Sequence, residues 1–210
     1  MRPILYSFRR CPYAMRARLA IQSAEIECEL REIVLRDKHP LFLETSPKGT
    51  VPVVVDDTRV IDESLDVMFW ALRQNDPEGW LRNLEAAQNL IAECDGPFKT
   101  ALDRYKYDTR YKDANAAEER EKAAQFLRKL DGLLEGQDFL MGGRACLADM
   151  AIITFVRQFA NTDRAWFDSQ PWPNLIRWLE VFLASDRFNA IMHKYVKWED
   201  THPIVVFPTP

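Results

Sequence analysis

The sequence predicts a two-part protein, in which an α/β domain at the N-terminus is followed by an all-helical domain. A short apolar run, a helical segment and an alternating segment follow one another near the N-terminus, in the order of a parallel βαβ unit. From Leu84 onward, apolar residues recur at helical spacing. A break rich in turn-forming residues separates the two parts. We therefore assign residues 1–76 to the α/β domain, 77–83 to a linker and 84–210 to the helical domain.

The elements of the α/β domain follow from local patterns. Ile4 and Leu5 mark a first strand, and Ile26–Val34 alternates as a half-buried strand. Between them a helix begins at Pro12, because proline suits the first helical position. A short helix is expected at 41–44, and the segments 53–55 and 59–61 are expected to form a hairpin. The next helix begins at Glu63-Ser64. Its apolar residues recur at helical spacing and should face the sheet: Leu65, Met68, Phe69 and Leu72.

In the helical domain, one apolar stripe is formed by Leu84, Ala87, Ile91, Cys94 and Phe98. A second helix is expected over 116–134, and the run 150–156 is apolar all round, which indicates a central buried helix. Cys146 precedes that helix as a poor N-cap, which Asp149 can assist. Further helices are expected from Trp172-Pro173 and over 187–193, and the extended segment 203–210 carries no signal of where it packs.

Composition excludes several classes of protein. The net charge of −4 provides no general field for nucleic acid, and no apolar run approaches the roughly 18 residues of a membrane span. The N-terminus lacks the apolar core of a signal peptide, and the four cysteines are widely spaced, so we expect a cytoplasmic protein with reduced thiols. The three histidines lie far apart in the sequence, which makes a metal site improbable.

Cys11 has the setting of a reactive thiol. It directly precedes Pro12, at or near the N-cap of the predicted helix, where backbone N–H groups and the helix dipole favour the thiolate. Arg9, Arg10, Arg16 and Arg18 add positive charge nearby, although a solvated basic face is the alternative for this group. A buried structural cysteine is the alternative for Cys11 itself. Ala14 stands where a C-x-x-C motif would have its second cysteine, so an outside thiol such as glutathione must resolve any mixed disulfide.

These residues carry a resemblance to a known family. Cys11-Pro-Tyr-Ala followed by Arg-Ala-Arg-Leu19 is similar to the glutaredoxin active-site turn, and resembles more closely the cysteine-type cytosolic glutathione transferases, of the omega class. Thr50-Val-Pro-Val-Val-Val55 and Asp62-Glu-Ser-Leu65 follow in that family's order and spacing. The resemblance implies a thioredoxin-like N-terminal domain, an all-α C-terminal bundle that forms the substrate pocket, and glutathione as cosubstrate.

The resemblance also implies a set of binding residues. Lys38 would contact the glycine carboxylate of glutathione, with Lys48 as the competing choice. A cis bond at Pro52 would expose the backbone of Val51 to the extended peptide; an ordinary trans proline is the alternative. Glu63 and Ser64 would hold the γ-glutamyl end, although the same groups also serve plain helix capping. A substrate pocket would be lined by Phe8, Tyr13, Tyr105 and Tyr107, of which the last two also suit a surface or dimer contact.

Three functions are compatible with these features. The first is a glutathione-dependent thioltransferase or reductase, in which the Cys11 thiolate forms a mixed disulfide with glutathione. The second is a transferase that conjugates glutathione to small electrophiles, with Tyr6, Ser7 or Tyr13 as the available hydroxyl. The third is a non-catalytic interaction module of the same fold. The expected partners are glutathione and a small disulfide or electrophile, and the expected assembly is a homodimer, with a monomer as the alternative.

Overall fold

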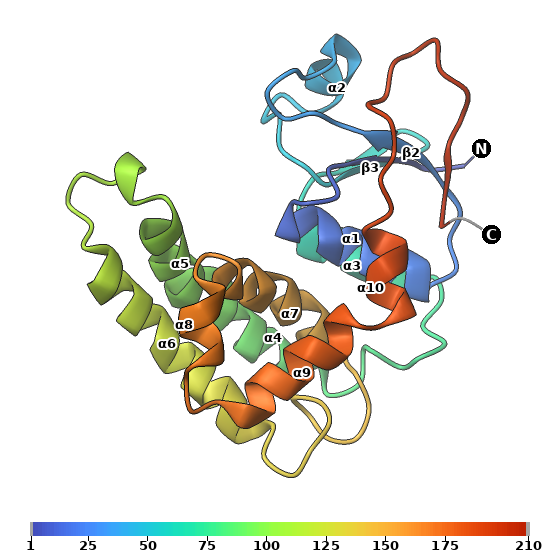
Figure 1. The fold of residues 1–210 in the computed structure, drawn as a ribbon. Helices are drawn as coiled ribbons and strands as arrows, with labels where there is room; N and C mark the ends of the chain where they lie inside the picture. Colours follow the sequence, from blue (N-terminus) through green and yellow to red (C-terminus); the bar gives the residue numbers. More distant parts are fainter. Residues whose placement is uncertain (1, 209–210) are drawn as a thin grey trace. The chain divides into compact units, whose positions relative to one another are not determined.

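A computed structural model describes residues 2–208 and divides them into two compact units (Figure 1). One unit contains the residues up to Glu78 together with those from Ala184 onward, and is built on a sheet. The other, Gly79–Leu183, is helical. The first boundary falls inside the predicted linker 77–83.

The sheet has five strands in the order β4-β3-β1-β2-β5. Their bounds are β1 Ile4–Ser7, β2 Cys28–Glu32, β3 Val53–Asp56, β4 Arg59–Ile61 and β5 Val206–Phe207. β1 and β2 are parallel, with Ile4 opposite Glu29, and the other pairs are antiparallel. The predicted βαβ unit and the predicted hairpin are therefore both present.

Three helices of the N-terminal segment cover the sheet: α1 (Pro12–Ser23), α2 (Pro40–Thr45) and α3 (Ser64–Leu72). Figure 1 shows α1 and α3 side by side on one side of the sheet and α2 on the other. α2 is fixed by Phe42, which is fully buried and has its ring centroid 5.2 Å from that of Tyr6 in β1. The glutathione transferase fold expected from the sequence is confirmed in this half.

The C-terminal segment corrects the predicted domain assignment. We expected residues 84–210 to form one helical domain, but the residues from Ala184 onward belong to the sheet unit. They contain α10 (Asp186–Ile191) and β5, which pairs with β2 and extends the sheet by one strand. Thr209 and Pro210 of the predicted extended tail lie outside the described residues.

Trp198 holds the segment between α10 and β5 on the sheet unit. Its ring centroid lies 4.5 Å from that of His39 and 6.0 Å from that of Tyr6, and the Arg31 guanidinium lies 4.3 Å from the Trp198 ring centroid. The Trp198 backbone N–H donates to the Glu32 backbone carbonyl at 2.9 Å. Because these partners come from the N-terminal hundred residues, hydropathy along the tail could not reveal this packing.

The helical unit is arranged around α7 (Leu147–Ala160), which is buried along most of its length, as predicted for the apolar run. The other helices are α4 (Leu84–Glu93), α5 (Lys99–Lys106), α6 (Ala116–Leu133), α8 (Arg164–Asp168) and α9 (Pro173–Leu183). A π-helix over Cys94–Phe98 joins α4 to α5 and contains Pro97, whose missing N–H is accommodated by the wider turn. A 3-10 turn, Asp108–Arg110, follows α5.

The start of α7 is well capped despite its cysteine. The Asp149 carboxylate accepts the Cys146 N–H at 2.9 Å and the Leu140 N–H at 2.8 Å, and Cys146 Sγ lies 3.1 Å from it. Burial raises the pKa of Asp149 and raises that of Cys146 to about 12. The predicted assistance from Asp149 is therefore confirmed.

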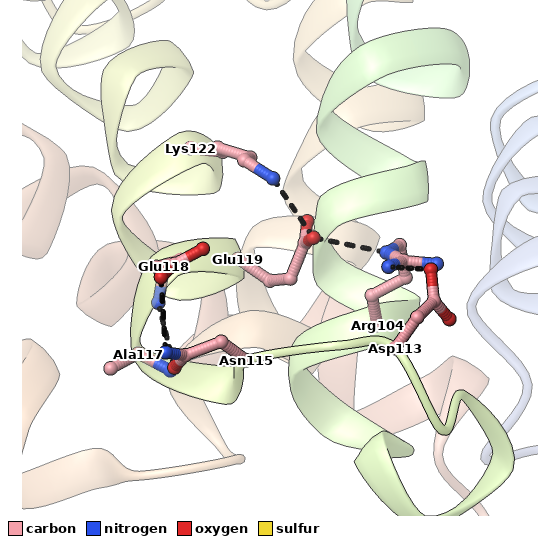
Figure 2. A network of polar contacts seen from close by, with 7 residues as sticks. All are labelled: Arg104, Asp113, Asn115, Ala117, Glu118, Glu119 and Lys122. Carbon is pink, nitrogen blue, oxygen red and sulfur yellow. Dashed lines mark hydrogen bonds and ion pairs between the residues drawn. The ribbon is translucent and has the colours of Figure 1, made fainter.

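A charged network joins α5 to the first turn of α6 (Figure 2). The buried Glu119 carboxylate accepts from Arg104 Nε at 3.0 Å and from Lys122 Nζ at 2.9 Å, and Arg104 also binds Asp113 at 2.9 Å. The hydrogen bond from Lys122, followed by that from Arg104, lowers the pKa of Glu119. Asn115 caps α6 by accepting the Ala117 N–H at 3.0 Å. The network links α5, the segment after it and α6.

Across residues 2–208, every helix falls short of the length and apolar character that crossing a membrane requires.

Candidate active site around Cys11

Cys11 is the N-cap of α1, with φ −77° and ψ 122°, and Pro12 occupies the first helical position. A turn precedes it, in which the Cys11 N–H donates to the Phe8 carbonyl at 2.9 Å. The residue is half-buried, and its side chain packs against an apolar cluster that contains Tyr6, Phe42 and Val51. The predicted position at the positive end of the helix is therefore observed, and it favours a thiolate at this sulfur.

The loop before β3 comes directly to this cysteine. The Val51–Pro52 bond is cis, as the resemblance implied, and Cys11 Sγ lies 3.7 Å from the Val51 carbonyl oxygen, within reach of an S–H hydrogen bond. Residues 40 positions apart in the chain thus meet at one point. An extended peptide that paired with the Val51 backbone would lie next to the sulfur.

Glu63 and Ser64 stand at the start of α3. Glu63 is the N-cap, with an exposed side chain, and Ser64 is buried in the first turn. Lys48 reaches both Asp62, at 2.9 Å, and Glu63, at 3.0 Å, and these hydrogen bonds raise the pKa of Lys48. Helix start, carboxylate and lysine therefore form one charged patch that suits a group carrying both signs of charge.

Lys38 lies over the turn that leads into Val51. A methyl group at Gly49, which has φ +61°, would come within 3.1 Å of Lys38 Nζ. Lys38 is half-buried, whereas Lys48 is exposed and engaged by two carboxylates. The two lysines that the sequence left as alternatives therefore differ in burial and in their partners.

The predicted basic group around Cys11 needs correction. Arg16 and Arg18 are fully buried, so neither contributes to a solvated face. Arg18 forms a buried ion pair with Glu32, which neutralises its charge. Arg9 and Arg10 remain in the turn beside Cys11.

Glu32 was not among the site residues predicted from the sequence. Its carboxylate accepts the Arg9 N–H at 2.9 Å, two residues before Cys11. A signal was present: Glu32 continues the inward phase of the strand after Cys28 and Leu30, and a charge in a buried phase requires a partner.

Two of the three candidate hydroxyls have partners away from the sulfur. Tyr6 Oη accepts from Arg31 at 2.7 Å, and Ser7 Oγ accepts from Arg18 Nε at 2.8 Å. Both residues are buried, with exposed fractions of 2 % and 0 %. Tyr13, the third, is half-buried next to the Arg16 guanidinium, which lies 5.8 Å from its ring centroid.

The four residues expected to line a substrate pocket are divided between the two units. Phe8 and Tyr13 lie in the sheet unit on either side of Cys11 in the chain, and Phe8 packs against the same apolar cluster. Tyr105 and Tyr107 lie in the helical unit. The ring centroids of Tyr105 and Phe159 are 5.4 Å apart, and the Arg110 guanidinium lies 4.3 Å from the Tyr107 ring centroid.

The remaining cysteines are structural in their surroundings. Cys28, Cys94 and Cys146 are fully buried. Burial raises the pKa of Cys28 and of Cys146 to about 12, so both stay protonated near neutral pH. In the described part of the chain, no group of three or more His, Cys, Asp or Glu side chains is placed to hold a metal ion.

Comparison with known proteins identifies the family. The model of the glutathione S-transferase N-terminal domain matches residues 5–79, and that of the glutathione S-transferase C-terminal domain matches residues 113–180. The chain belongs to the glutathione S-transferase family. Glutathione is the cosubstrate of this family.

Individual relatives of this glutathione S-transferase are distant. Glutathione S-transferase D7 of Drosophila melanogaster is 25% identical over 193 residues, which cover 84% of this chain and 82% of the relative. A glutathione transferase family member from Pseudomonas fluorescens, solved with two glutathione bound, has a TM-score of 0.77 and 18% sequence identity. The match covers 90% of this chain and 92% of that protein. Glutathione transferase Omega 3C from Trametes versicolor has a TM-score of 0.76 and 16% sequence identity. The match covers 93% of this chain and 91% of that protein. The similarity to the solved structures establishes the fold, and the two family models establish the family.

Proposed function

We propose that this glutathione S-transferase is a cysteine-type, omega-like thioltransferase that acts on glutathione mixed disulfides in the cytoplasm. The observation that carries the proposal is the position of Cys11 as the N-cap of α1, with its sulfur beside the Val51 carbonyl. A helix start stabilises a thiolate, and a thiolate is the species that attacks a disulfide.

The reaction proceeds in two exchanges. The Cys11 thiolate attacks the glutathione sulfur of a mixed disulfide, a Cys11–glutathione disulfide forms, and the other thiol leaves as a thiolate that takes up a proton from water. The thiolate of a second glutathione then attacks the glutathione sulfur on Cys11, which releases oxidised glutathione and restores the Cys11 thiolate. One disulfide is consumed and one is formed, so the electrons balance.

The proposal assigns each part of glutathione to a residue of the site. The Val51 backbone pairs with the extended peptide, Lys38 takes its glycine carboxylate, and Glu63 with Ser64 holds the γ-glutamyl end. Phe8 and Tyr13, on either side of Cys11 in the chain, contact the second substrate, a small disulfide. The active protein is a homodimer, which light scattering of the purified chain tests against a monomer.

Conjugation to electrophiles and a non-catalytic role are less well supported. Conjugation in this fold needs a hydroxyl or amide next to the glutathione sulfur, and the hydroxyls of Tyr6 and Ser7 are engaged by Arg31 and Arg18. A cysteine at this position instead exchanges with the cofactor. An interaction module has no requirement for a thiol at a helix N-terminus.

Mass spectrometry of the intact protein tests the proposal. Wild type incubated with oxidised glutathione is expected to gain one glutathione adduct, which reduced glutathione removes and which Cys11→Ser does not form. If no adduct forms at Cys11 while glutathione still binds, the thioltransferase mechanism is wrong and conjugation assays on small electrophiles follow. If glutathione does not bind, the non-catalytic role remains.

A further inference from the structure

The Arg18 side chain is a fully buried cation in the sheet unit. Its Nε donates to Ser7 Oγ at 2.8 Å, one terminal nitrogen donates to the Ile191 carbonyl at 2.9 Å, and the other binds the Glu32 carboxylate. These acceptors stand at the ends of β1, α10 and β2. Burial lowers the pKa of Arg18, and the attraction of Glu32 opposes that shift.

Glu32 divides its two carboxylate oxygens between Arg18 and the turn before Cys11. One oxygen binds Arg18, and the other accepts the Arg9 N–H at 2.9 Å. Arg9 lies inside the turn that the Cys11 N–H closes on the Phe8 carbonyl. The first interior N–H of the turn is therefore fixed by a side chain from β2.

The C-terminal segment enters the same arrangement. Arg9 itself reaches the Met192 carbonyl at 3.4 Å, and the Arg18 guanidinium lies 5.6 Å from the Tyr195 ring centroid and 5.8 Å from that of Phe207. The Glu32 carbonyl accepts the Trp198 N–H. The ion pair thus joins the turn of Cys11 to the segment that follows α10.

Stability alone does not require such a pair. Well-packed apolar residues replace a buried ion pair with little or no loss of stability, whereas a buried pair fixes one geometry, because each charge must meet its partner. Here the partner of Glu32 on the far side is a backbone N–H two residues from the sulfur. The pair is therefore in direct contact with the turn that presents Cys11.

We infer that Glu32 is a positioning residue for Cys11, which holds the Phe8–Cys11 turn through the Arg9 N–H, while Arg18 fixes the Glu32 carboxylate and links it to the C-terminal segment. The inference deepens the proposed function, because a thiolate must be held at the helix start and aligned with the disulfide that it attacks. It is tested without glutathione, so the two can fail separately.

The measured quantity is the rate at which iodoacetamide alkylates Cys11 at pH 7, followed by intact mass. The variants are Glu32→Gln and Glu32→Asp. The matched control is Glu119→Gln, which breaks a buried carboxylate–arginine pair in the helical unit, where the side chain is 6% exposed, as against 8% for Glu32. Circular dichroism gives the folded fraction of each variant.

Both Glu32 variants are expected to slow alkylation about fivefold, and Glu119→Gln to change it less than about twofold. With the turn released, the sulfur leaves the helix start and behaves more like an ordinary cysteine, which is about 3 % ionised at pH 7. Glu32→Asp keeps the charge but is one methylene too short to reach both the Arg9 N–H and Arg18, so it separates geometry from charge.

Three results would overturn the inference. Faster alkylation in Glu32→Gln, with a wild-type rate in Glu32→Asp, would assign Glu32 an effect through its charge. Unchanged rates in both folded variants would leave Glu32 a purely structural role. An equal decrease of the alkylation rate in Glu119→Gln would attribute the effect to general destabilisation. If Glu32→Gln does not fold, Arg18→Lys, which keeps the charge and loses the fork of contacts, gives the same comparison.

Discussion

Cys11 Sγ lies 3.7 Å from the carbonyl oxygen of Val51, and in the proposed function this contact places the nucleophile beside the backbone with which the peptide pairs. The thiol can donate to that carbonyl only while it is protonated. Ionisation removes the donor and leaves the carbonyl oxygen to accept another N–H. Formation of the thiolate and pairing of an extended peptide with Val51 are therefore mutually compatible steps.

The four cysteines are expected to differ in reactivity. Iodoacetamide at pH 7.5 should add one group to the folded protein, at Cys11, because Cys28, Cys94 and Cys146 are fully buried and the pKa of Cys28 and Cys146 is raised to about 12. In denaturant, four groups should be added. Peptide mapping locates the modified residue, and rapid labelling of Cys28 in the folded state would contradict the described burial.

Lys38 and Lys48 are expected to differ in their effect on glutathione binding. Lys38→Ala should weaken binding about fivefold, the size of a partly exposed charge contact of about 1 kcal/mol. Lys48→Ala should change it by less than about twofold, because Lys48 is engaged by Asp62 and Glu63. Isothermal titration calorimetry measures both dissociation constants. The reverse order would assign the glycine carboxylate to Lys48.

Glu119 should make stability depend on acid pH. Its pKa is lowered in the folded state by Lys122 and Arg104, so it contributes stability above the unfolded pKa of about 4.3 that is lost as pH falls through the folded value. Glu119→Gln should lower the free energy of unfolding by about 2 kcal/mol at pH 7.

Urea unfolding at pH 7 and at pH 3.5 measures that difference. It should shrink at the lower pH, which lies below the unfolded pKa of about 4.3, because the unfolded chain then takes up a proton at this carboxyl group. A difference that stays constant across this range would mean that the substitution acts through packing, with no contribution from the ionised carboxylate.

Trp198 should stabilise the sheet unit although it lies in the C-terminal tail. Trp198→Ala is expected to lower the free energy of unfolding by about 2 kcal/mol, because it removes ring contacts with His39 and Tyr6 and the stacked Arg31. The control is Val196→Ala, two residues earlier, where the side chain is 77 % exposed and the expected change is within about 0.5 kcal/mol. Equal effects at the two positions would contradict the described packing of the tail.

Local signals in the sequence determined much of this protein. Pro12 after Cys11 marked the start of α1, alternation marked β2, and the apolar run over 150–156 marked the central helix. These features depend on neighbours in the chain, so periodicity and capping chemistry report them. The motif order further indicated the family, and with it the cis bond at Val51–Pro52.

Only the tertiary structure decided which distant groups meet. The segment from Ala184 onward belongs to the sheet unit, because β5 pairs with β2 and Trp198 packs on Tyr6. Arg18, which was expected to supply positive charge near the thiol, is instead the ion-pair partner of Glu32. Both outcomes depend on contacts between residues more than ten positions apart, and often far more. Such contacts are set by packing and by the need to pair a buried charge, which no local pattern encodes.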